Sequence, residues 1–481
     1  MNIHIKKLHN DSKTTLVYDF IILGAGISGI YSTFLLTQQY PNAKILIIEK
    51  YKTYGGRVYT FKNQHMTVNA GAGRFHNNQP RIWELIDILG LTSKKVLIDK
   101  SLGYAPADNS NRILYSNFEA PRENALFSFS NHIYNVGEDI TKGALDFIFG
   151  PKTIPNAALI LKLIIASKSY ESHFLRNIRF IDFAKIVLSE QEVQFIDDSF
   201  GYSDKLHRSN AFDTLLLIQN NQSPINDFYT LKGGLGQIND KMMNYILKNK
   251  NVTFKFSHSV ENIDILSRDQ DNPRVVVGCK GIHKRFIGKY CISTLPVQAL
   301  LKIPFFYPLK KSFLKFIVCT PMCRIFAKYK PRDNGFVWFK NIVKSTTNNN
   351  LRMVLPIDYK NGIIMISYCD TKYAQFWKTL YDSKGRSGVH RSIIKFVRQS
   401  YGIDIDSDEL IDLQLFYWDC AVGHWGVGAN SQYISNSLLQ PFENVPLSIC
   451  GEQFSATGQQ WMEGGLETAY KVVSSIIHQR L

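Results

Sequence analysis

The chain has 481 residues, of which 45% are hydrophobic and 20% charged, so it is globular rather than disordered. Its length predicts two domains with large cores. Lysine and arginine outnumber aspartate and glutamate by 56 to 40, and the net charge is +16. Because these basic residues form neither a long run nor a stripe interleaved with aromatic side chains, we expect no nucleic-acid partner and attribute the charge mainly to compositional drift.

The stretch 19–30 organises the rest of the chain. An apolar strand ends here at three glycines, and a helix over 27–39 begins. Gly24 permits the tight turn, Gly26 leaves the backbone open to a pyrophosphate, and Gly29 lets helix and strand pack closely. The free N–H groups at the start of the helix favour a phosphate. This spacing predicts a dinucleotide site.

The next strand, 44–49, ends at Glu49, twenty positions after Gly29. A carboxylate at this distance reaches a ribose 2′-OH, which indicates an adenosine without a 2′-phosphate. Gly55, Gly56 and Arg57 follow. This glycine pair and cation suit a second backbone approach and a bidentate hold on a phosphate. A solvated surface charge is the other interpretation of Arg57.

With these residues the sequence resembles the flavin-containing amine oxidase superfamily, which includes monoamine, polyamine and L-amino-acid oxidases. Two later blocks carry the same resemblance. One is 228–238, which contains the letters KGGLGQ, and the other is the pair Gly451 and Glu452 followed by the letters WMEGG at 461–465. The resemblance implies an α/β fold, in which a Rossmann-like FAD-binding domain is interleaved with an α+β substrate domain of antiparallel sheet and helices.

Both expected domains are discontinuous. The FAD-binding domain comprises 15–76, 228–299 and 441–481, and the substrate-binding domain comprises 77–227 and 300–440. The first part of the substrate domain has helical spacing, whereas the second is rich in strands. In that second part, strands are predicted at 313–320, 324–329, 335–339, 351–356 and 363–368, and helices at 373–381 and 389–401.

The resemblance implies FAD held without a covalent bond, because His424 stands where the covalently flavinylated enzymes have cysteine. Glu452 would hold the ribityl chain, and the helix that begins near Met462 would face the flavin pyrimidine, where reduced flavin carries negative charge. The residues expected to bind the cofactor are Gly24, Gly26, Ile27, Ser28, Gly29, Glu49, Lys50, Gly56, Arg57, Gly73, Arg74, Val260, Gly451, Glu452, Trp461 and Met462.

The resemblance also implies four catalytic positions. Lys302 would bind a water above flavin N5 and promote the reaction with oxygen, or else snorkel from a helix end. Trp461 and Trp425 would form the two walls of an aromatic slot for a neutral amine, or else be core tryptophans. Arg74, on a glycine-rich turn, would bind a substrate carboxylate as in L-amino-acid oxidases, or else pair with a flavin phosphate or an acid of the substrate domain.

The predicted function is the oxidation of amines, with a preference for L-amino acids. Hydride passes from the amine-bearing carbon to flavin N5, and oxygen is reduced to hydrogen peroxide. The alternatives are a monoamine or polyamine oxidase without carboxylate recognition, a desaturase or porphyrinogen-type oxidase, and a catalytically silent FAD-binding scaffold. The expected partners are therefore a small amine or amino acid and molecular oxygen, with a homodimer as one arrangement of the chain.

Seven cysteines, all in the second half of the chain, predict reduced thiols in an intracellular, reducing compartment such as the cytoplasm. The polar stretch 1–15 predicts no secretory signal. The apolar stretch 157–166 is too short to span a membrane and contains Lys162, so we expect a buried helix there and no membrane anchor.

Overall fold

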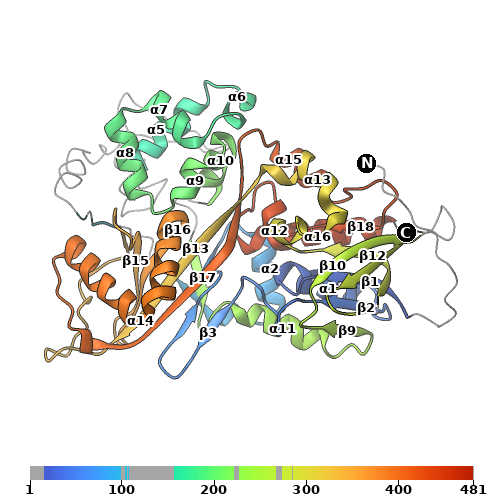
Figure 1. Cartoon of the computed structure of the whole chain (residues 1–481), viewed down its shortest axis with the longest axis horizontal. Coiled ribbons are helices and arrows are strands. Elements are labelled where there is room, and N and C mark those ends of the chain that lie inside the picture. The colour runs from blue at the N-terminus through green and yellow to red at the C-terminus, as the bar shows by residue number, and fades with distance from the viewer. Residues whose placement is uncertain are drawn as a thin grey trace.

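A computed structural model of the chain describes residues 16–98, 103–105, 107, 157–221, 227–266, 273–283 and 285–479. The stretch 1–15, from which we predict no secretory signal, lies outside these residues, as does most of 99–156. The described part is elongated, with one β-sheet toward each end and helices packed around both (Figure 1).

The first sheet carries the glycine-rich turn. Its strand order is β10, β11, β12, β1, β2 and β9, and β18 also pairs with β12. Strands β18, β12, β1, β2 and β9 are parallel to one another, whereas β11 pairs antiparallel with both β10 and β12. The bounds are β1 Val17–Leu23, β2 Ile45–Ile48, β9 Val252–Lys255, β10 Val260–Leu266, β11 Arg274–Cys279, β12 Phe286–Ser293 and β18 Leu447–Ile449.

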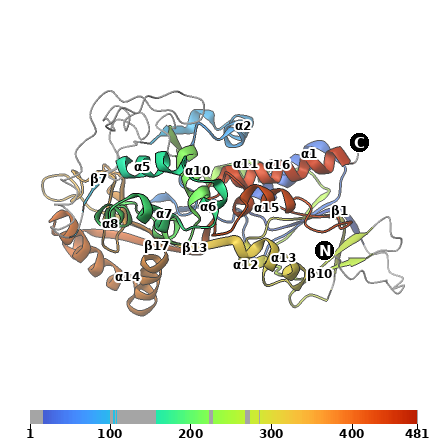
Figure 2. The ribbon, with the colours of Figure 1, turned by 90° about the horizontal axis from the view of Figure 1, so that it is seen from above.

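Strand β1 is apolar from Phe20 to Leu23 because both faces of this sheet are covered there. Phe20 and Ile22 pack on one face against α1 and α16, whereas Ile21 and Leu23 pack on the other face near α12 and α13. Figure 2 shows α1 and α16 on one side of β1 and α12 and α13 on the other. The helices near this sheet are α1 Ile27–Gln39, α2 Pro80–Ile88, α11 Gly236–Ile246, α12 Val297–Leu300, α13 Tyr307–Ser312, α15 Ser431–Ser437 and α16 Met462–Gln479.

The second sheet has the order β17, β13, β16, β15, β14 and β7, and its first five strands are antiparallel. Its two longest strands, β13 and β17, pair with each other and run from this sheet toward the first one (Figure 1). The bounds are β7 Gly103–Tyr104, β13 Ile317–Tyr329, β14 Ser345–Thr346, β15 Met353–Asp358, β16 Ile363–Asp370 and β17 Leu410–Trp425.

Helices cover the second sheet. Helix α14, Thr371–Tyr401, packs on it through buried side chains such as Trp377 and Ile393, and it breaks at Gly385, where φ is 59°. A cluster of short helices with its own core lies nearby, and Figure 1 shows it as the green helices at the top. Its members are α5 Ala157–Ser167, α6 Ser172–Arg176, α7 Phe180–Val187, α8 Glu190–Ser199, α9 Ser203–His207 and α10 Ala211–Asn221.

Two small sheets complete the described structure. Strands β3 and β4 form a hairpin, and β5 and β6 pair on either side of β8. Their bounds are β3 Thr60–Lys62, β4 Thr67–Asn69, β5 Phe75–His76, β6 Lys95–Leu97 and β8 Phe228–Leu231. None of the described helices is both long and apolar enough to cross a membrane.

The structure corrects two local predictions. The strand expected at 335–339 is a series of turns, because Gly335 has φ of 78° and the buried aromatic side chains after it reach the core without pairing. The strands expected at 313–320 and 324–329 form one continuous strand, β13, preceded by short helical turns.

The prediction of seven reduced thiols is wrong for two of them. Cys319 on β13 and Cys420 on β17 form a disulfide, with their Cα atoms 5.3 Å apart. In the pairing of the two strands Cys319 lies opposite Gly423, and the register shifts between Thr320 and Met322, where Cys420 lies in the extra residues of β17. The other five cysteines are free and buried.

Candidate active site

The turn between β1 and α1 depends on its glycines. Gly24 has φ of 98°, a conformation that residues with a side chain rarely adopt. A Cβ atom on Gly29 would lie 2.0 Å from the carbonyl oxygen of Gly24, so only glycine lets the helix pack this closely. A Cβ atom on Gly26, by contrast, would meet no heavy atom within 4 Å. The backbone at Gly26 therefore faces open space.

The second glycine pair lies on the first turn. Gly55 donates its N–H to the carbonyl oxygen of Ala25 at 2.8 Å, and a Cβ atom on Gly56 would come within 3.1 Å of the Cα atom of Gly26. Gly56 itself has φ of 56°. The two glycine motifs, which are separate in the sequence, thus form one close-packed backbone surface beside the start of α1.

Glu49 closes the same turn from the end of β2. Its Oε2 accepts the N–H of Ala25 at 2.8 Å and its Oε1 accepts the N–H of Tyr51 at 2.9 Å. The backbone of His258, shortly before Val260, donates to the carbonyl oxygen of Glu49 at 2.9 Å. The chain that leads into β10 therefore lies beside Glu49, where the adenosine is expected. Lys50, in contrast, is exposed, with its Nζ 4.4 Å from the ring centroid of Tyr51.

A cavity of about 940 Å³ opens next to this turn and extends between the two sheets. That volume is at the upper end of the range for small-molecule sites. Residues from the segments around both sheets line its walls. The predicted site residues that line it are Ile27, Arg57, Gly73, Arg74, Glu452, Trp461 and Met462, and the other polar or aromatic residues include Tyr202, Lys205, Arg324, Tyr368, Asp370, Trp418, His424 and Gln460.

Glu452 joins three segments at the cavity wall. Its carboxylate accepts Arg57 Nη1 at 2.7 Å, the N–H of Gly423 at 3.0 Å and the N–H of Gln460 at 2.5 Å. Arg57 also donates to the carbonyl oxygen of Ala421 at 2.9 Å. Arg57 is therefore not a solvated surface charge, because it ties the segment after β2 to β17.

Arg74 lies among aromatic side chains. Its guanidinium carbon is 4.6 Å from the ring centroid of Phe228 and 5.7 Å from that of Trp461, and these two rings stack with centroids 6.1 Å apart. Among the residues that the structure describes, no carboxylate forms an ion pair with Arg74. A partly buried guanidinium without an acid, at the wall of a cavity, is suited to a carboxylate ligand.

Lys205, on α9, faces the cavity from the helical cluster. The residue is only 5% exposed. Burial, with a further contribution from Arg74, lowers the pKa of the Lys205 ammonium to about 7. Asp370 nearby accepts the backbone N–H groups of Ser203 and Asp204, each at 3.0 Å, and burial raises the pKa of its carboxyl to about 6.

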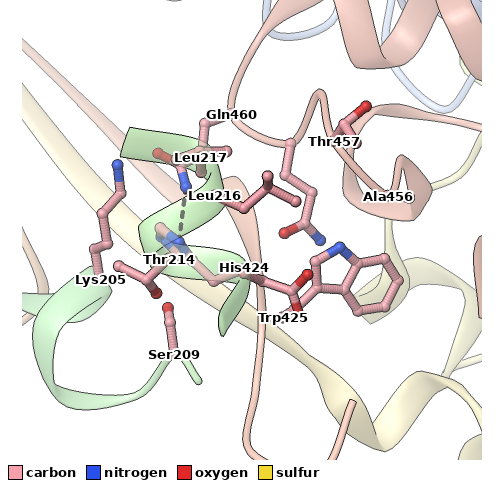
Figure 3. A pocket seen from close by; sticks show the side chains of 12 residues that line it. Lys205, Ser209, Thr214, Leu216, Leu217, His424, Trp425, Ala456, Thr457 and Gln460 are labelled. Carbon is pink, nitrogen blue, oxygen red and sulfur yellow. Dashed lines mark hydrogen bonds between the residues drawn. The ribbon is translucent and has the colours of Figure 1, made fainter. Parts of the chain in front are cut away.

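His424 lines both the large cavity and a smaller pocket beside it. Figure 3 shows this pocket, with Lys205, His424 and Gln460 around it and a hydrogen bond between the last two. That bond joins Gln460 Nε2 to His424 Nδ1 at 2.9 Å. Burial lowers the pKa of His424 to about 3, so the imidazole is neutral at physiological pH.

The profile of the flavin containing amine oxidoreductase family matches residues 27–477. The chain belongs to this family. It is an FAD-dependent oxidoreductase, as its sequence predicts.

Two of the relatives align with nearly the whole chain. An uncharacterized protein of Acanthamoeba polyphaga mimivirus is 22% identical over 508 residues, which cover 96% of each protein. L-amino-acid oxidase 4 of Hebeloma cylindrosporum is 20% identical over 526 residues, which cover 95% of this chain and 81% of that protein. The solved structure of a putrescine oxidase mutant has a TM-score of 0.69 and 14% identity, and covers 97% of this chain and 100% of that one. This likeness confirms the predicted fold class.

The residues of this oxidoreductase fit FAD. No described side chain caps the start of α1, and its first turn holds no acid, so its N–H groups are available to a pyrophosphate. The open space at Gly26 adjoins these groups, and Ile27 lines the cavity. The start of α16, at Met462, lines the same cavity from another direction. Gly465 lies in the first turn of α16, and a Cβ atom on it would lie 2.7 Å from Ser28 Oγ in the first turn of α1. The starts of the two helices therefore lie side by side.

Two residues that the sequence assigned to catalysis do not reach the large cavity. Lys302 is exposed beyond the end of α12 and does not line it. Trp425 is 2% exposed and lies in the core beneath the first sheet, where its Nε1 donates to the carbonyl oxygen of Ser455 at 3.1 Å. His424, its neighbour on β17, occupies the cavity wall instead. The structure thus brings Trp461 and Arg74 together, without Lys302 or Trp425.

Sequence reasoning missed Lys205 and Asp370 as site residues. Lys205 stands in a short polar helix with no motif around it, and Asp370, at the end of β16, contacts the start of α9 from a distant part of the chain. Neither residue carries a local signal, because their proximity arises only when α9 packs against the end of β16. The sequence signals for cations in this cavity were the glycines beside Arg57 and Arg74.

Proposed function

We propose that this amine oxidase acts on L-amino acids, with Arg74 binding the substrate carboxylate. The observation that carries the proposal is the position of Arg74, which lines the cavity against Phe228 and Trp461 and has no acidic partner in the described chain. Bound FAD supplies the acceptor for the hydride of the amine-bearing carbon and passes the electrons on to molecular oxygen, with release of hydrogen peroxide.

The charges around the cavity support a substrate with a carboxylate. Arg74, Lys205 and Arg324 line it, whereas the carboxylate of Glu452 already pairs with Arg57 and that of Asp370 is held by two backbone N–H groups. A diamine would bring a second positive charge to this surface. An amino acid instead neutralises Arg74 and orients its Cα–H through a bidentate contact.

We further propose that FAD is held without a covalent bond. His424, at the position where covalently flavinylated relatives have cysteine, has its Nδ1 joined to Gln460 and is deeply buried. Denaturing precipitation of the holoprotein should release all of the yellow colour to the supernatant. Colour that stays in the pellet would contradict this proposal.

The test of the substrate is anaerobic bleaching of the flavin absorbance by a panel of L-amino acids, their decarboxylated amines and polyamines. In the variant Arg74→Met we expect the KM for an L-amino acid to rise steeply. The loss of the charged hydrogen bonds to the carboxylate should weaken substrate binding by about 2–4 kcal/mol. The KM for the matching amine and the FAD content should change little. Arg398→Met, which removes an exposed arginine that pairs with Asp404, is the matched control.

Bleaching by amines or polyamines, and by no amino acid, would contradict the carboxylate site. The protein would then be a plain amine oxidase, the alternative that its likeness to putrescine oxidase favours. Bleaching by none of these compounds would favour a silent FAD-binding scaffold.

A further inference from the structure

Lys205 is a buried lysine that faces the cavity without a partner. Within the described chain its Nζ forms neither an ion pair nor a hydrogen bond, and it lies 5.9 Å from the ring centroid of Phe200. The side chain lines both the large cavity and the smaller pocket beside it, where Figure 3 shows it extended along the wall formed by α10. A buried ammonium in this position has lost its water without gaining a counter-ion.

The charged groups around Lys205 explain why it lacks a partner. Both nearby carboxylates are committed elsewhere. Asp204 pairs with Arg208 and accepts the hydroxyl of Thr320, and Asp370 accepts two backbone N–H groups. The groups that act on this region from the surrounding elements are Arg74 before β5, Tyr202 before α9, Asp204 and Arg208 of α9, Arg324 of β13, Tyr368 and Asp370 of β16, and His424 of β17.

These surroundings favour the neutral form of the Lys205 amine. Burial and the repulsion from Arg74 bring its pKa to about 7, so near neutral pH a large fraction of the molecules carry a free electron pair on Nζ. Few lysines have this property, because an exposed ammonium stays protonated up to a pH of about 10.

We propose that Lys205 accepts the proton that the substrate ammonium must lose before the amine can be oxidised. The inference rests on the proposed amine oxidation. A hydride leaves the substrate carbon only when the nitrogen has an electron pair with which to form the C=N bond. In the proposed step an N–H bond of the substrate ammonium breaks and its electron pair stays on the substrate nitrogen. The electron pair of Nζ forms the new N–H bond, so the positive charge moves to Lys205.

The other groups at the cavity are poorer proton acceptors. Arg74 and Arg324 are always protonated. His424 has its Nδ1 joined to Gln460 and a pKa of about 3. Burial raises the pKa of the Tyr202 hydroxyl, so it does not ionise at neutral pH. Asp370 uses both carboxylate oxygens on backbone N–H groups.

Substrate binding would itself make Lys205 a better base. A carboxylate bound at Arg74 cancels the positive charge that repels a proton on Lys205. An amino acid would therefore raise the proton affinity of Lys205 at the moment when its own ammonium must be deprotonated. A plain amine would lack this effect, which provides a physical reason for a preference for amino acids.

The test compares the anaerobic rate of flavin reduction by an L-amino acid in wild type, Lys205→Met and Lys205→Arg from pH 6 to pH 10. At pH 7 we expect both variants to lose about 100-fold or more, as for removal of a general base. Lys205→Met should recover most of the rate at pH 10, where the substrate loses its proton to water. Lys378→Met, an exposed lysine on α14, is the matched control and should follow wild type.

A second readout needs no turnover. Reductive methylation followed by mass spectrometry should modify Lys205 with a midpoint near pH 7, well below that of Lys378 in the same sample. This measurement keeps the inference testable even if Lys205→Met does not fold, and Lys205→Arg serves the same purpose.

Three outcomes would overturn the role of Lys205. They are a pH profile of Lys205→Met equal to that of wild type, an unchanged rate in Lys205→Arg, or a methylation midpoint equal to that of Lys378. Each is distinct from failure of the proposed function, in which no amine or amino acid would reduce the wild-type flavin at any pH.

Discussion

At the scale of single residues, Glu452 shows how one carboxylate can hold a site together. It is 8% exposed and accepts hydrogen bonds from Arg57, from Gly423 on β17 and from Gln460 before α16. These three donors belong to three separate segments of the chain. Removing the acceptor would leave two backbone N–H groups unpaired and take the carboxylate away from Arg57, which costs more than the loss of a surface ion pair.

We therefore expect Glu452→Ala to lower the free energy of unfolding by about 2–3 kcal/mol and to reduce the FAD content of the purified protein. Denaturant unfolding of the apoprotein and the ratio of flavin to protein absorbance measure the two effects. Glu84→Ala, which removes the exposed partner of Arg81 on α2, is the control and should change the stability by less than about 0.5 kcal/mol. Equal stability of the two variants would show that Glu452 has no such structural role.

At the scale of elements, the β1–α1 unit combines two different demands on glycine. Gly29 is needed inside the protein, because any Cβ atom there would overlap the backbone of Gly24. Gly26 is not needed for packing, because its missing side chain faces open space. Its backbone is extended, with φ of −76° and ψ of 179°, a conformation that other residues adopt readily. We therefore propose that the ligand, rather than packing, requires glycine at this position.

This difference predicts opposite results for two substitutions. Gly26→Val should fold with nearly unchanged stability and bind little FAD, because the side chain would fill the space for the pyrophosphate. Gly29→Ala should lower the free energy of unfolding by about 2 kcal/mol or more, because the helix must move away from the strand. Circular dichroism, denaturant unfolding and flavin content separate the two effects. Full flavin content in Gly26→Val would contradict the phosphate site.

At the scale of the whole molecule, the cavity exists because β13 and β17 extend from one sheet to the other. We propose that the chain divides as its sequence predicts, into an FAD-binding part around the first sheet and a substrate-binding part around the second. The cavity then combines phosphate-binding turns from one part with Lys205, Arg324 and Asp370 from the other. Long-range packing, rather than any one segment, places a lysine with a lowered pKa in its wall.

That lysine makes the stability of the whole fold depend on pH. The pKa of Lys205 is about 7 in the folded protein, below its value of about 10.4 in an unfolded chain. Between these values the unfolded chain binds more protons than the folded one, so stability rises with pH. From pH 7 to pH 9 we expect the free energy of unfolding of wild type to increase by about 2 kcal/mol more than that of Lys205→Met.

Denaturant unfolding at the two pH values measures this difference, and Lys378→Met should behave as wild type does. Asp370 does not interfere, because its pKa is raised to about 6 and its contribution is lost as the pH rises from about 4 to 6, below the window. Parallel changes in wild type and Lys205→Met would show that Lys205 is protonated throughout.

The sequence by itself determined the features that depend on near neighbours in the chain. The spacing of Gly24, Gly26 and Gly29 predicted the turn, and the confirmed family and fold class followed from this motif together with Glu452 and the later glycine blocks. The helix breaks were also predictable, because Gly385 separates the two expected helices within α14. Such features are local, since steric limits on φ and ψ and the period of apolar residues act over a few positions.

Only the tertiary structure decided which side chains face the cavity. On β17, successive residues point to opposite faces, so a shift of one position puts His424 in the wall and Trp425 in the core. Lys302 and Lys205 are equally ordinary in the sequence, yet one is exposed and the other is buried beside Arg74. Their difference comes from the packing of α9 against distant strands, because the environment of a charge depends on neighbours in space that no local pattern encodes.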